Sequence, residues 1–506
     1  MNPRTSAAVA AGKIAGAVSR ISRLGGGTAV AGLAAERIDH DIVSNLVGQA
    51  GEGAIAVTGT NGKTTTSLML SRIASGSALR PLHNRSGSNL MRGVAAMLVE
   101  ESTFAGAIPD AKRRLAILEV DEATLPAIVR AAAPRAIVFT NLFRDQLDRY
   151  GEVDTVAKAW ERALAPATRD DRQQTTDNRQ QTPTNTRQTA TNTRQTAPGT
   201  RGAPLLVLNA DDPGVAHLGR GVPRERVLYY GIEDTSAGIE SDEHASDFRT
   251  CLECGSELVY GVTFYGHLGH WRCTSCGNRR PVPDIALTKV TAGADATALT
   301  IGIARHDDAL PPGEMKLRLP LTGLYNAYNA LAATAGALAL GLPRDAIGPA
   351  LEGFTAAFGR QERFAIEGRD VAVLLGKNPT GLNQVLRAIA AAEGPKRLLV
   401  FLNDGIADGR DVSWIWDADY ELVQPRTEWV LAAGTRAEDL ALRLKYAGFG
   451  EDVPVEHDTG RALSRAVEAT PRGGTLYVIP TYTAMLDVRD LLAKRAGGRR
   501  FWEDGR

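Results

Sequence analysis

Short apolar runs alternate with longer helical patterns in two separate parts of the chain. In the first part, four segments predict buried strands: GAIAVTG, RRLAILEV, PRAIVF and APLLVLN. Two consecutive helices are predicted further on, in TGLYNAYNALAATAGALALGL and PRDAIGPALEGF. Continuous apolar runs joined by helical segments are typical of a parallel sheet that is covered on both faces. The pattern therefore predicts an α/β fold.

The alternation restarts after about Phe358. Five further segments predict strands: VAVLLGK, RLLVFLND, EWVLAAGT, DVPVEH and TLYVIPTY. We therefore expect a second α/β domain over 359–506. It follows a central domain over 46–358 and an N-terminal helical segment over 1–45.

Composition adds limits on partners and location. The 506 residues predict two or three domains. Lys plus Arg and Asp plus Glu both number 58, so no overall positive charge favours nucleic acid. Residues 2–27 predict an amphipathic helix and not a signal peptide, because Lys13, Arg20 and Arg23 interrupt the apolar run. The longest apolar stretch, Leu331 to Leu342, is too short to cross a bilayer, so we expect a cytoplasmic protein without transmembrane helices.

Two segments interrupt the central domain. Residues 168–201 repeat the unit TNTRQTA and have few apolar side chains to bury, so we expect them to be disordered and assign them no function. The second interruption, over 249–283, contains all four cysteines in the pattern C-x2-C-x18-C-x2-C.

That spacing predicts a zinc ribbon in which Cys251, Cys254, Cys273 and Cys276 hold one Zn²⁺. Four thiolates close a tetrahedral site and leave no open position, so the metal is expected to be structural. Each cysteine pair is followed by a glycine, Gly255 or Gly277, where the turn favours positive φ. His267 and His270 lie between the pairs, and we expect them on the ribbon surface and not as ligands.

A glycine-rich turn, TGTNGKTTT, joins the first predicted strand to a helix. Backbone amides in such a turn cradle phosphates, Lys63 is suited to the β and γ phosphates, and the Thr64 hydroxyl to Mg²⁺. The generic phosphate-loop pattern fails here, because its first glycine falls on Val57. The predicted phosphate site has these residues instead: Gly59, Thr60, Asn61, Gly62, Lys63, Thr64 and Thr65.

The segment GTNGKTT resembles the ATP loop of the Mur ligase family, which includes the peptidoglycan amino-acid ligases and folylpolyglutamate synthase. Other segments resemble motifs of that family in the same order: ILEVDE, TNLFRDQLDRYG, LNADDP, YNAYNALAA and GRQERF. The resemblance implies a central ATP-binding domain and a Rossmann-like C-terminal domain. It implies that Glu119 is a Mg²⁺ ligand, that Asn326 and Asn329 reach the adenine, and that Arg363 contacts the nucleotide. The implied reaction is phosphorylation of a carboxylate by ATP, followed by attack of an amine.

Two positions depart from the amino-acid-adding members of that family. Gln146 stands where they have His, and Lys377 precedes Asn378-Pro379. These departures, the four-cysteine segment and DGRDVSWIWDADYE (408–421) are similar to the MurT-type subunits of lipid II isoglutaminyl synthase. That subgroup implies a GatD-type glutaminase subunit as partner in a heterodimer. It also implies lipid II as substrate, at the inner face of the membrane.

The same resemblance implies that Asp411 is the catalytic residue of the segment. It either completes the Cys–His pair of the partner or guides ammonia, and the sequence does not separate these roles. Asp408, Asp417 and Asp419 are expected to be caps or turn formers. Trp414 and Trp416 are interpreted either as core residues or as anchors at the subunit interface.

Two other hypotheses compete. An amino-acid-adding ligase of the same family, such as a folylpolyglutamate or muropeptide ligase, is disfavoured by the cysteines and by Lys377. A zinc-ribbon ATPase that binds nucleic acid is disfavoured by the zero net charge and the absence of a basic run.

Overall fold

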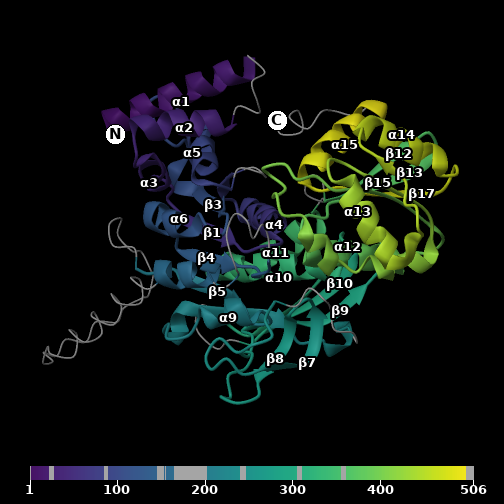
Figure 1. Ribbon diagram of the computed structural model, residues 1–506. Helices are drawn as coiled ribbons and strands as arrows, with labels where there is room; N and C mark the ends of the chain where they lie inside the picture. The colour runs from purple at the N-terminus through teal and green to yellow at the C-terminus, as the bar shows by residue number, and fades with distance from the viewer. Residues whose placement is uncertain are drawn as a thin grey trace, which may run out of the picture.

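Two β-sheets organise the chain, with helices on both faces of each (Figure 1). The computed structural model describes residues 2–21, 28–84, 89–144, 153, 155–164, 202–239, 247–293, 295–304, 310–354 and 360–496. Gln146 and the predicted disordered insert over 168–201 lie outside these ranges. None of the helices within them combines the length and apolar character needed to cross a membrane.

The first sheet has nine strands in the order β11-β10-β9-β6-β5-β4-β1-β3-β2 in the described part of the chain. Their bounds are β1 Ala54–Thr58, β2 Arg80–His83, β3 Arg114–Glu119, β4 Ala136–Phe139, β5 Leu205–Asn209, β6 Val227–Ile232, β9 Ile285–Ala292, β10 Thr297–Ile303 and β11 Gly313–Leu319. The strands from β2 to β9 pair in parallel, as the apolar runs predict. Strands β10 and β11 are antiparallel, so the sheet is mixed.

Side chains of the central strands alternate between two apolar cores, because successive residues of a strand point to opposite faces. Ile55 and Val57 of β1 pack with one set of helices, and Ala54 and Ala56 with the other. The first set is α4 Lys63–Gly76, α10 Leu324–Ala339 and α11 Ile347–Glu352. The second set is α3 Ile42–Val47, α5 Met91–Glu101, α6 Leu125–Ala132 and α9 Pro213–His217.

The second sheet has six strands in the order β12-β13-β17-β14-β15-β16. Their bounds are β12 Arg360–Ile366, β13 Arg369–Leu374, β14 Lys396–Phe401, β15 Thr427–Ala433, β16 Val455–Glu456 and β17 Thr475–Ile479. Only β12 pairs antiparallel. Helices α12 Pro379–Ala391 and α13 Ala437–Leu444 cover one face, and α14 Thr459–Ala469 and α15 Tyr482–Arg495 cover the other.

Two smaller pieces attach to the first sheet. Helices α1 Pro3–Ile21 and α2 Thr28–Ile38 form an antiparallel pair that packs on α5 (Figure 1). A separate hairpin, β7 Leu258–Tyr265 and β8 Leu268–Cys273, extends from the opposite end of the sheet.

Candidate active site

The turn between β1 and α4 needs glycine at two positions. Gly59 has φ of +127° and Gly62 has φ of +86°, in the region that side chains other than glycine rarely adopt. A Cβ on Gly59 would lie 2.2 Å from the Thr140 hydroxyl, and one on Gly62 would lie 2.1 Å from the Asn329 side-chain oxygen. The turn thus brings its backbone against two polar side chains, which a Cβ would displace.

Residues that follow β4 hold this turn in place. The Thr60 hydroxyl donates to the carbonyl of Phe143 at 3.0 Å and accepts from its amide at 2.9 Å. The amide of Asn61 donates to the Asn141 side-chain oxygen at 2.8 Å. The conformation of the turn is therefore imposed from the neighbouring strand, before any ligand binds.

Lys63 and Thr64, at the start of α4, contact two carboxylates at and just after the end of β3. The Lys63 ammonium lies 2.8 Å from a Glu122 carboxylate oxygen, and both side chains are buried. The Thr64 hydroxyl donates to a Glu119 carboxylate oxygen at 2.8 Å. Thr65 is buried on the same first turn. Glu122 was missed as a site residue in the sequence, although it stands in the same ILEVDE segment as Glu119.

These side chains are of the kinds that bind Mg²⁺ and the phosphates of ATP. Hard cations such as Mg²⁺ prefer oxygen ligands, and the Thr64 hydroxyl and the Glu119 carboxylate converge at one point. Lys63 also donates to the carbonyl of Gly59 at 2.5 Å, so its ammonium lies over the turn whose amides would face phosphate. The structure thus assembles a cation-binding pair and an anion-binding turn at one sheet edge.

A cleft of about 740 Å³, including space open to solvent, runs beside this turn. Its walls come from three parts of the chain: the turn and Asn141, the aromatic residues Tyr265 and Tyr325 with Asn329, and residues 374–385 of the second sheet unit. Asn329 of α10 lies in the cleft, and its side-chain nitrogen is 3.4 Å from the Asn326 oxygen. The structure therefore brings Asn329 to the predicted phosphate turn (residues 59–65), and Asn326 lies behind it, bound to Asn329 and to the carbonyl of Thr322.

The two sheet units touch at the turn itself. The Asn378 side chain donates to the Asn61 side-chain oxygen at 3.0 Å. Its own oxygen accepts from the amide of Gly381 at 2.8 Å, which caps α12, and Pro379 occupies the first helical position. The Asn-Pro pair after Lys377 thus starts a helix and contacts the phosphate turn at the same time.

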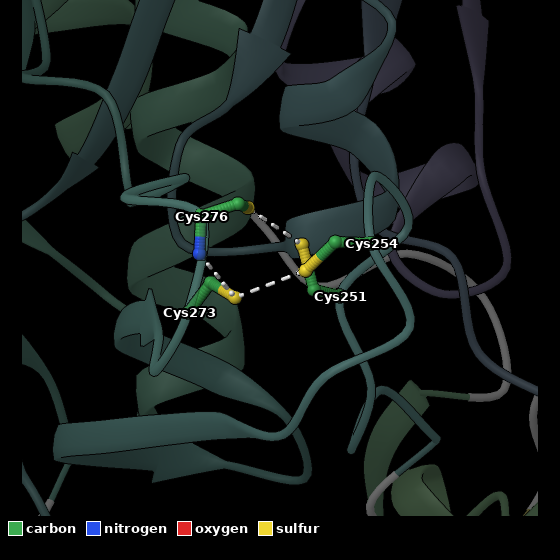
Figure 2. Close-up of side chains that lie close together, drawn as sticks. All are labelled: Cys251, Cys254, Cys273 and Cys276. Carbon is green, nitrogen blue, oxygen red and sulfur yellow. Dashed lines mark hydrogen bonds between the residues drawn. The ribbon is translucent and has the colours of Figure 1, made fainter.

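Four cysteine side chains converge at one end of the β7–β8 hairpin (Figure 2). Their sulfur atoms all lie within 4.8 Å of one another, and the pairs Cys251–Cys276 and Cys254–Cys273 are 3.6 and 3.5 Å apart. Zinc–sulfur bonds of about 2.3 Å place the sulfurs of a tetrahedral site about 3.8 Å apart. Gly255 and Gly277 have φ of +73° and +74°, as the turns of such a site require. The four cysteines therefore could hold a metal ion.

The other end of the hairpin is buried, and this corrects one expectation. His267 is fully buried, so its predicted place on the ribbon surface is wrong. One of its ring nitrogens lies 3.2 Å from the carboxylate of Asp212, which also accepts from the amide of Leu142 at 2.7 Å. The hairpin folds back onto the ends of β4 and β5, and this contact is not encoded in the local sequence pattern.

Tyr265 precedes the hairpin turn and was also missed in the sequence. Its ring lines the cleft, 6.0 Å from the ring of Phe143 and 5.6 Å from that of Tyr328 on α10. Phe143 is the residue that binds the Thr60 hydroxyl. The four-cysteine hairpin is therefore a structural support of the cleft.

Arg363 and Asp411 are exposed, and neither is among the residues that line the cleft. Arg363 on β12 is exposed and pairs with Asp370 at 2.5 Å. Asp411 is exposed, and its carboxylate accepts from the amide of Ser413 at 2.9 Å. Hydrogen bonds from the Ser413 side chain and backbone lower the pKa of Asp411 below its usual value.

The neighbours of Asp411 divide between core and surface. Asp408 is buried and accepts from the Thr483 amide at 2.9 Å, so it caps the start of α15; burial raises its pKa. Trp414 packs on the core of the second sheet unit. Trp416 is 48% exposed, with the guanidinium of Arg443 5.7 Å from its ring centre.

Comparisons with known proteins agree with this architecture. The Mur ligase middle domain model matches residues 57–180, and the MurT ligase C-terminal model matches residues 375–485. The chain is 31% identical to the protein named lipid II isoglutaminyl synthase (glutamine-hydrolyzing) subunit MurT of Staphylococcus aureus, over 93% of this chain and 94% of that protein. The protein of the same name from Streptococcus pneumoniae is also 31% identical, with 98% of each chain covered.

Solved structures show the same fold at lower identity. A pseudomurein peptide ligase type C from Methanothermus fervidus has a TM-score of 0.61 at 21% identity, over 88% of this chain and 79% of that one. MurF from Acinetobacter baumannii has a TM-score of 0.57 at 17% identity, over 90% of this chain and 80% of that one.

The fold and the relatives together define a carbon–nitrogen ligase of the Mur type, a family that implies ATP and Mg²⁺. Within that class, the chain belongs to the MurT family of subunits.

Proposed function

We propose that this chain is the ligase subunit that converts the D-isoglutamate α-carboxylate of lipid II to the amide of D-isoglutamine, in peptidoglycan synthesis. The observation that most directly supports this proposal is the pairing of Lys63 with Glu122 and of Thr64 with Glu119 at the phosphate turn of a MurT family member. ATP transfers its terminal phosphate to the carboxylate, and ammonia attacks the acyl phosphate and releases phosphate.

Each residue of the turn has a role in this proposal. The amides of residues 59–65 and the Lys63 ammonium stabilise charge that develops on the transferred phosphate. Thr64 and Glu119 would hold Mg²⁺, which supplies further charge neutralisation when bound. Asn326 and Asn329 contact the adenine. Arg363 reaches the nucleotide only if the two sheet units rearrange, since it is exposed and paired with Asp370 in this conformation.

Ammonia comes from a GatD-type glutaminase partner, as the words glutamine-hydrolyzing and subunit in the names of the relatives suggest. Asp411 is exposed and is not among the residues that line the cleft, and the half-exposed Trp416 follows it five positions later in the chain. This position favours a contribution to the partner's Cys–His pair over a step at the acyl phosphate. We propose that Trp416 anchors the partner.

Mass spectrometry of lipid II tests the function directly. Lipid II is incubated with the protein, ATP and Mg²⁺, together with either ammonium salt or glutamine plus the partner glutaminase. The proposal expects amidation of the stem peptide under both conditions. Hydrolysis of ATP that depends on an added amino acid, with no amidation by ammonium, would favour an amino-acid-adding ligase instead.

The cysteines and the domain limits carry separate proposals. We propose that Cys251, Cys254, Cys273 and Cys276 hold one structural Zn²⁺, because their sulfur spacing matches a tetrahedral site. Elemental analysis should find about one zinc per chain, and the Cys254→Ser variant should lose it.

The proposed domains are residues 1–45, residues 46–358 and a Rossmann-like domain over 359–506. Limited proteolysis tests these limits.

A further inference from the structure

The helix α1 presents an apolar face to solvent. Ile14 and Val18, one turn apart, are 60% and 59% exposed, and Ala7 and Ala17 on the same side are also exposed. The opposite side of α1 already has its partner: Ala8 and Val9 are fully buried, and a Cβ on Gly12 would meet the Ala31 carbonyl of α2 at 2.9 Å. The exposed face is therefore additional to the packing that holds α1 on the protein.

Charge on this part of the chain is of one sign. The first 35 residues contain four basic side chains and no acidic one, the first acid being Glu36. Lys13 extends beside a second exposed apolar side chain, with its ammonium 5.6 Å from the ring centre of Phe104, which is 67% exposed. Lys13 also donates to the carbonyl of Glu100 on α5 at 2.9 Å. Exposed apolar side chains on a helix whose own charges are basic are typical of helices that lie in the interface of anionic membranes.

The exposed apolar residues of α1 lie toward the catalytic edge of the first sheet. Because α1 and α2 are antiparallel and Gly12 faces Ala31, Ile14 and Val18 lie beside the start of α2. Gly32 of α2 in turn approaches the backbone of Arg92, in the first turn of α5. The carbonyl of Asn89, two residues before α5, accepts from the amide of Asp121, which lies between Glu119 and Glu122. The apolar half of α1 thus lies toward the same edge of the sheet as the phosphate turn, although α1 and α4 cover opposite faces.

We propose that α1 docks the protein on the surface of an anionic phospholipid bilayer, with Ile14 and Val18 in the headgroup boundary and the basic side chains on the lipid phosphates. The inference rests on the proposed function, because a substrate anchored by a lipid chain must be reached at a membrane. Such a contact is expected to be weak and reversible, and to hold the catalytic edge near the carbohydrate and peptide part of the substrate.

Vesicle sedimentation tests the contact with the full chain. Vesicles of equal parts phosphatidylglycerol and phosphatidylcholine are compared with pure phosphatidylcholine. We expect about tenfold or greater preference for the anionic vesicles, which falls as salt is raised. The double variant Ile14→Ser/Val18→Ser should lower binding to anionic vesicles about tenfold or more, because two apolar side chains leave the interface. Its folding is checked by its melting temperature.

Val282→Ser is the matched control, since Val282 is 82% exposed in the segment after β8. It should bind vesicles as the unmodified protein does. Absence of vesicle binding by the unmodified protein, or equal binding by the double variant, would overturn the proposal. Loss of glutaminase association or of self-association in the double variant, with vesicle binding unchanged, would also overturn it and assign the face to a protein.

A water-soluble lipid II analogue with a shortened lipid separates this inference from the proposed function. The double variant should amidate the soluble analogue at the unmodified rate and lipid II in anionic vesicles more slowly. If no protein amidates either substrate, the proposed function fails, and the sedimentation result still decides the membrane contact.

Discussion

The phosphate turn and Asp411, in the segment from Asp408 to Glu421, hold their polar groups in opposite ways. In the turn, Lys63, Thr64 and Thr60 are buried and bound to partners from neighbouring strands. By contrast, Asp411 is exposed, and within the described part of the chain its carboxylate accepts from Ser413, two positions away. The first arrangement is preorganised for a ligand of fixed shape. The second presents a carboxylate outward, as a contribution to another subunit would require.

The largest expected effect comes from Lys63→Met. Amidation with ammonium should fall about 10³-fold, because the ammonium that stabilises the transferred phosphate is lost. Stability should also fall by about 3–5 kcal/mol, since Glu122 is left buried without this partner. Single-turnover rates and melting temperatures measure the two effects.

The double variant Lys63→Met/Glu122→Gln is the control for that loss of stability. It should recover most of the melting temperature and none of the rate. A folded Lys63→Met protein with a rate near that of the unmodified chain would contradict the role assigned to the turn.

Asp411→Asn should separate the two regions. Amidation driven by glutamine and the partner glutaminase should fall about 100-fold, while amidation driven by ammonium should persist. The melting temperature should not change, because Asp411 is exposed. The lowered pKa of Asp411 keeps it ionised at neutral and mildly acidic pH, so its protonation should not limit the rate there.

Asp417→Asn removes another carboxylate of the same segment and is the matched control. It should retain amidation driven by glutamine and amidation driven by ammonium. Loss of ammonium-driven activity in Asp411→Asn would place Asp411 in the amidation step instead.

His83, at the end of β2, should make the first sheet unit sensitive to acid. Burial lowers the pKa of His83 to about 4, and its ring nitrogen lies 3.0 Å from the Ser67 hydroxyl of α4. The unfolded chain binds this proton with a pKa of about 6.5, so protonation favours unfolding as pH falls from there toward 4. The free energy of unfolding should fall by about 2 kcal/mol between pH 7.5 and 5 from this residue.

Denaturant titrations of the unmodified chain and His83→Asn measure that difference. The variant should show a flatter pH dependence over the same window. Parallel pH profiles would show that His83 does not carry the effect.

Removal of metal from the cysteine hairpin should weaken nucleotide binding about tenfold, because Tyr265 at the other end of the hairpin lines the cleft. Titration of a fluorescent ATP analogue into the chelator-treated protein measures this. Tyr265→Ala, with metal retained, should reproduce the effect. Unchanged affinity in the metal-free protein would show that the hairpin wall is dispensable.

Much of the fold was predictable because its strands are buried on both faces. Continuous apolar runs such as AIAVT and RLAILE form β1 and β3, where neither face contacts water. The antiparallel edges were not predictable in the same way. Strand β11 has the sequence GEMKLRL, and its mostly exposed, charged residues give a weak strand signal.

The candidate site was predictable where chemistry is local in the chain. Gly59, Gly62, Lys63 and Thr64 come from one glycine-rich turn between a strand and a helix, and such a turn predicts phosphate binding. Glu122, Tyr265 and Asn378 were not identified, because each gains its role from a contact across more than 50 positions of the chain or between the two sheet units. A carboxylate at a strand end, a tyrosine in a hairpin and an asparagine before proline all have common structural explanations.

The sequence by itself determined the strand–turn–helix of the candidate phosphate site, the spacing of the four cysteines, and the division into two alternating α/β parts. These depend on local backbone geometry and on the period of apolar residues. Only the tertiary structure decided that His267 is buried, that the cysteine hairpin supports the cleft, and that the apolar face of α1 lies toward the sheet edge of the phosphate turn. Those outcomes depend on which distant segments bury one another, and local patterns do not specify that choice.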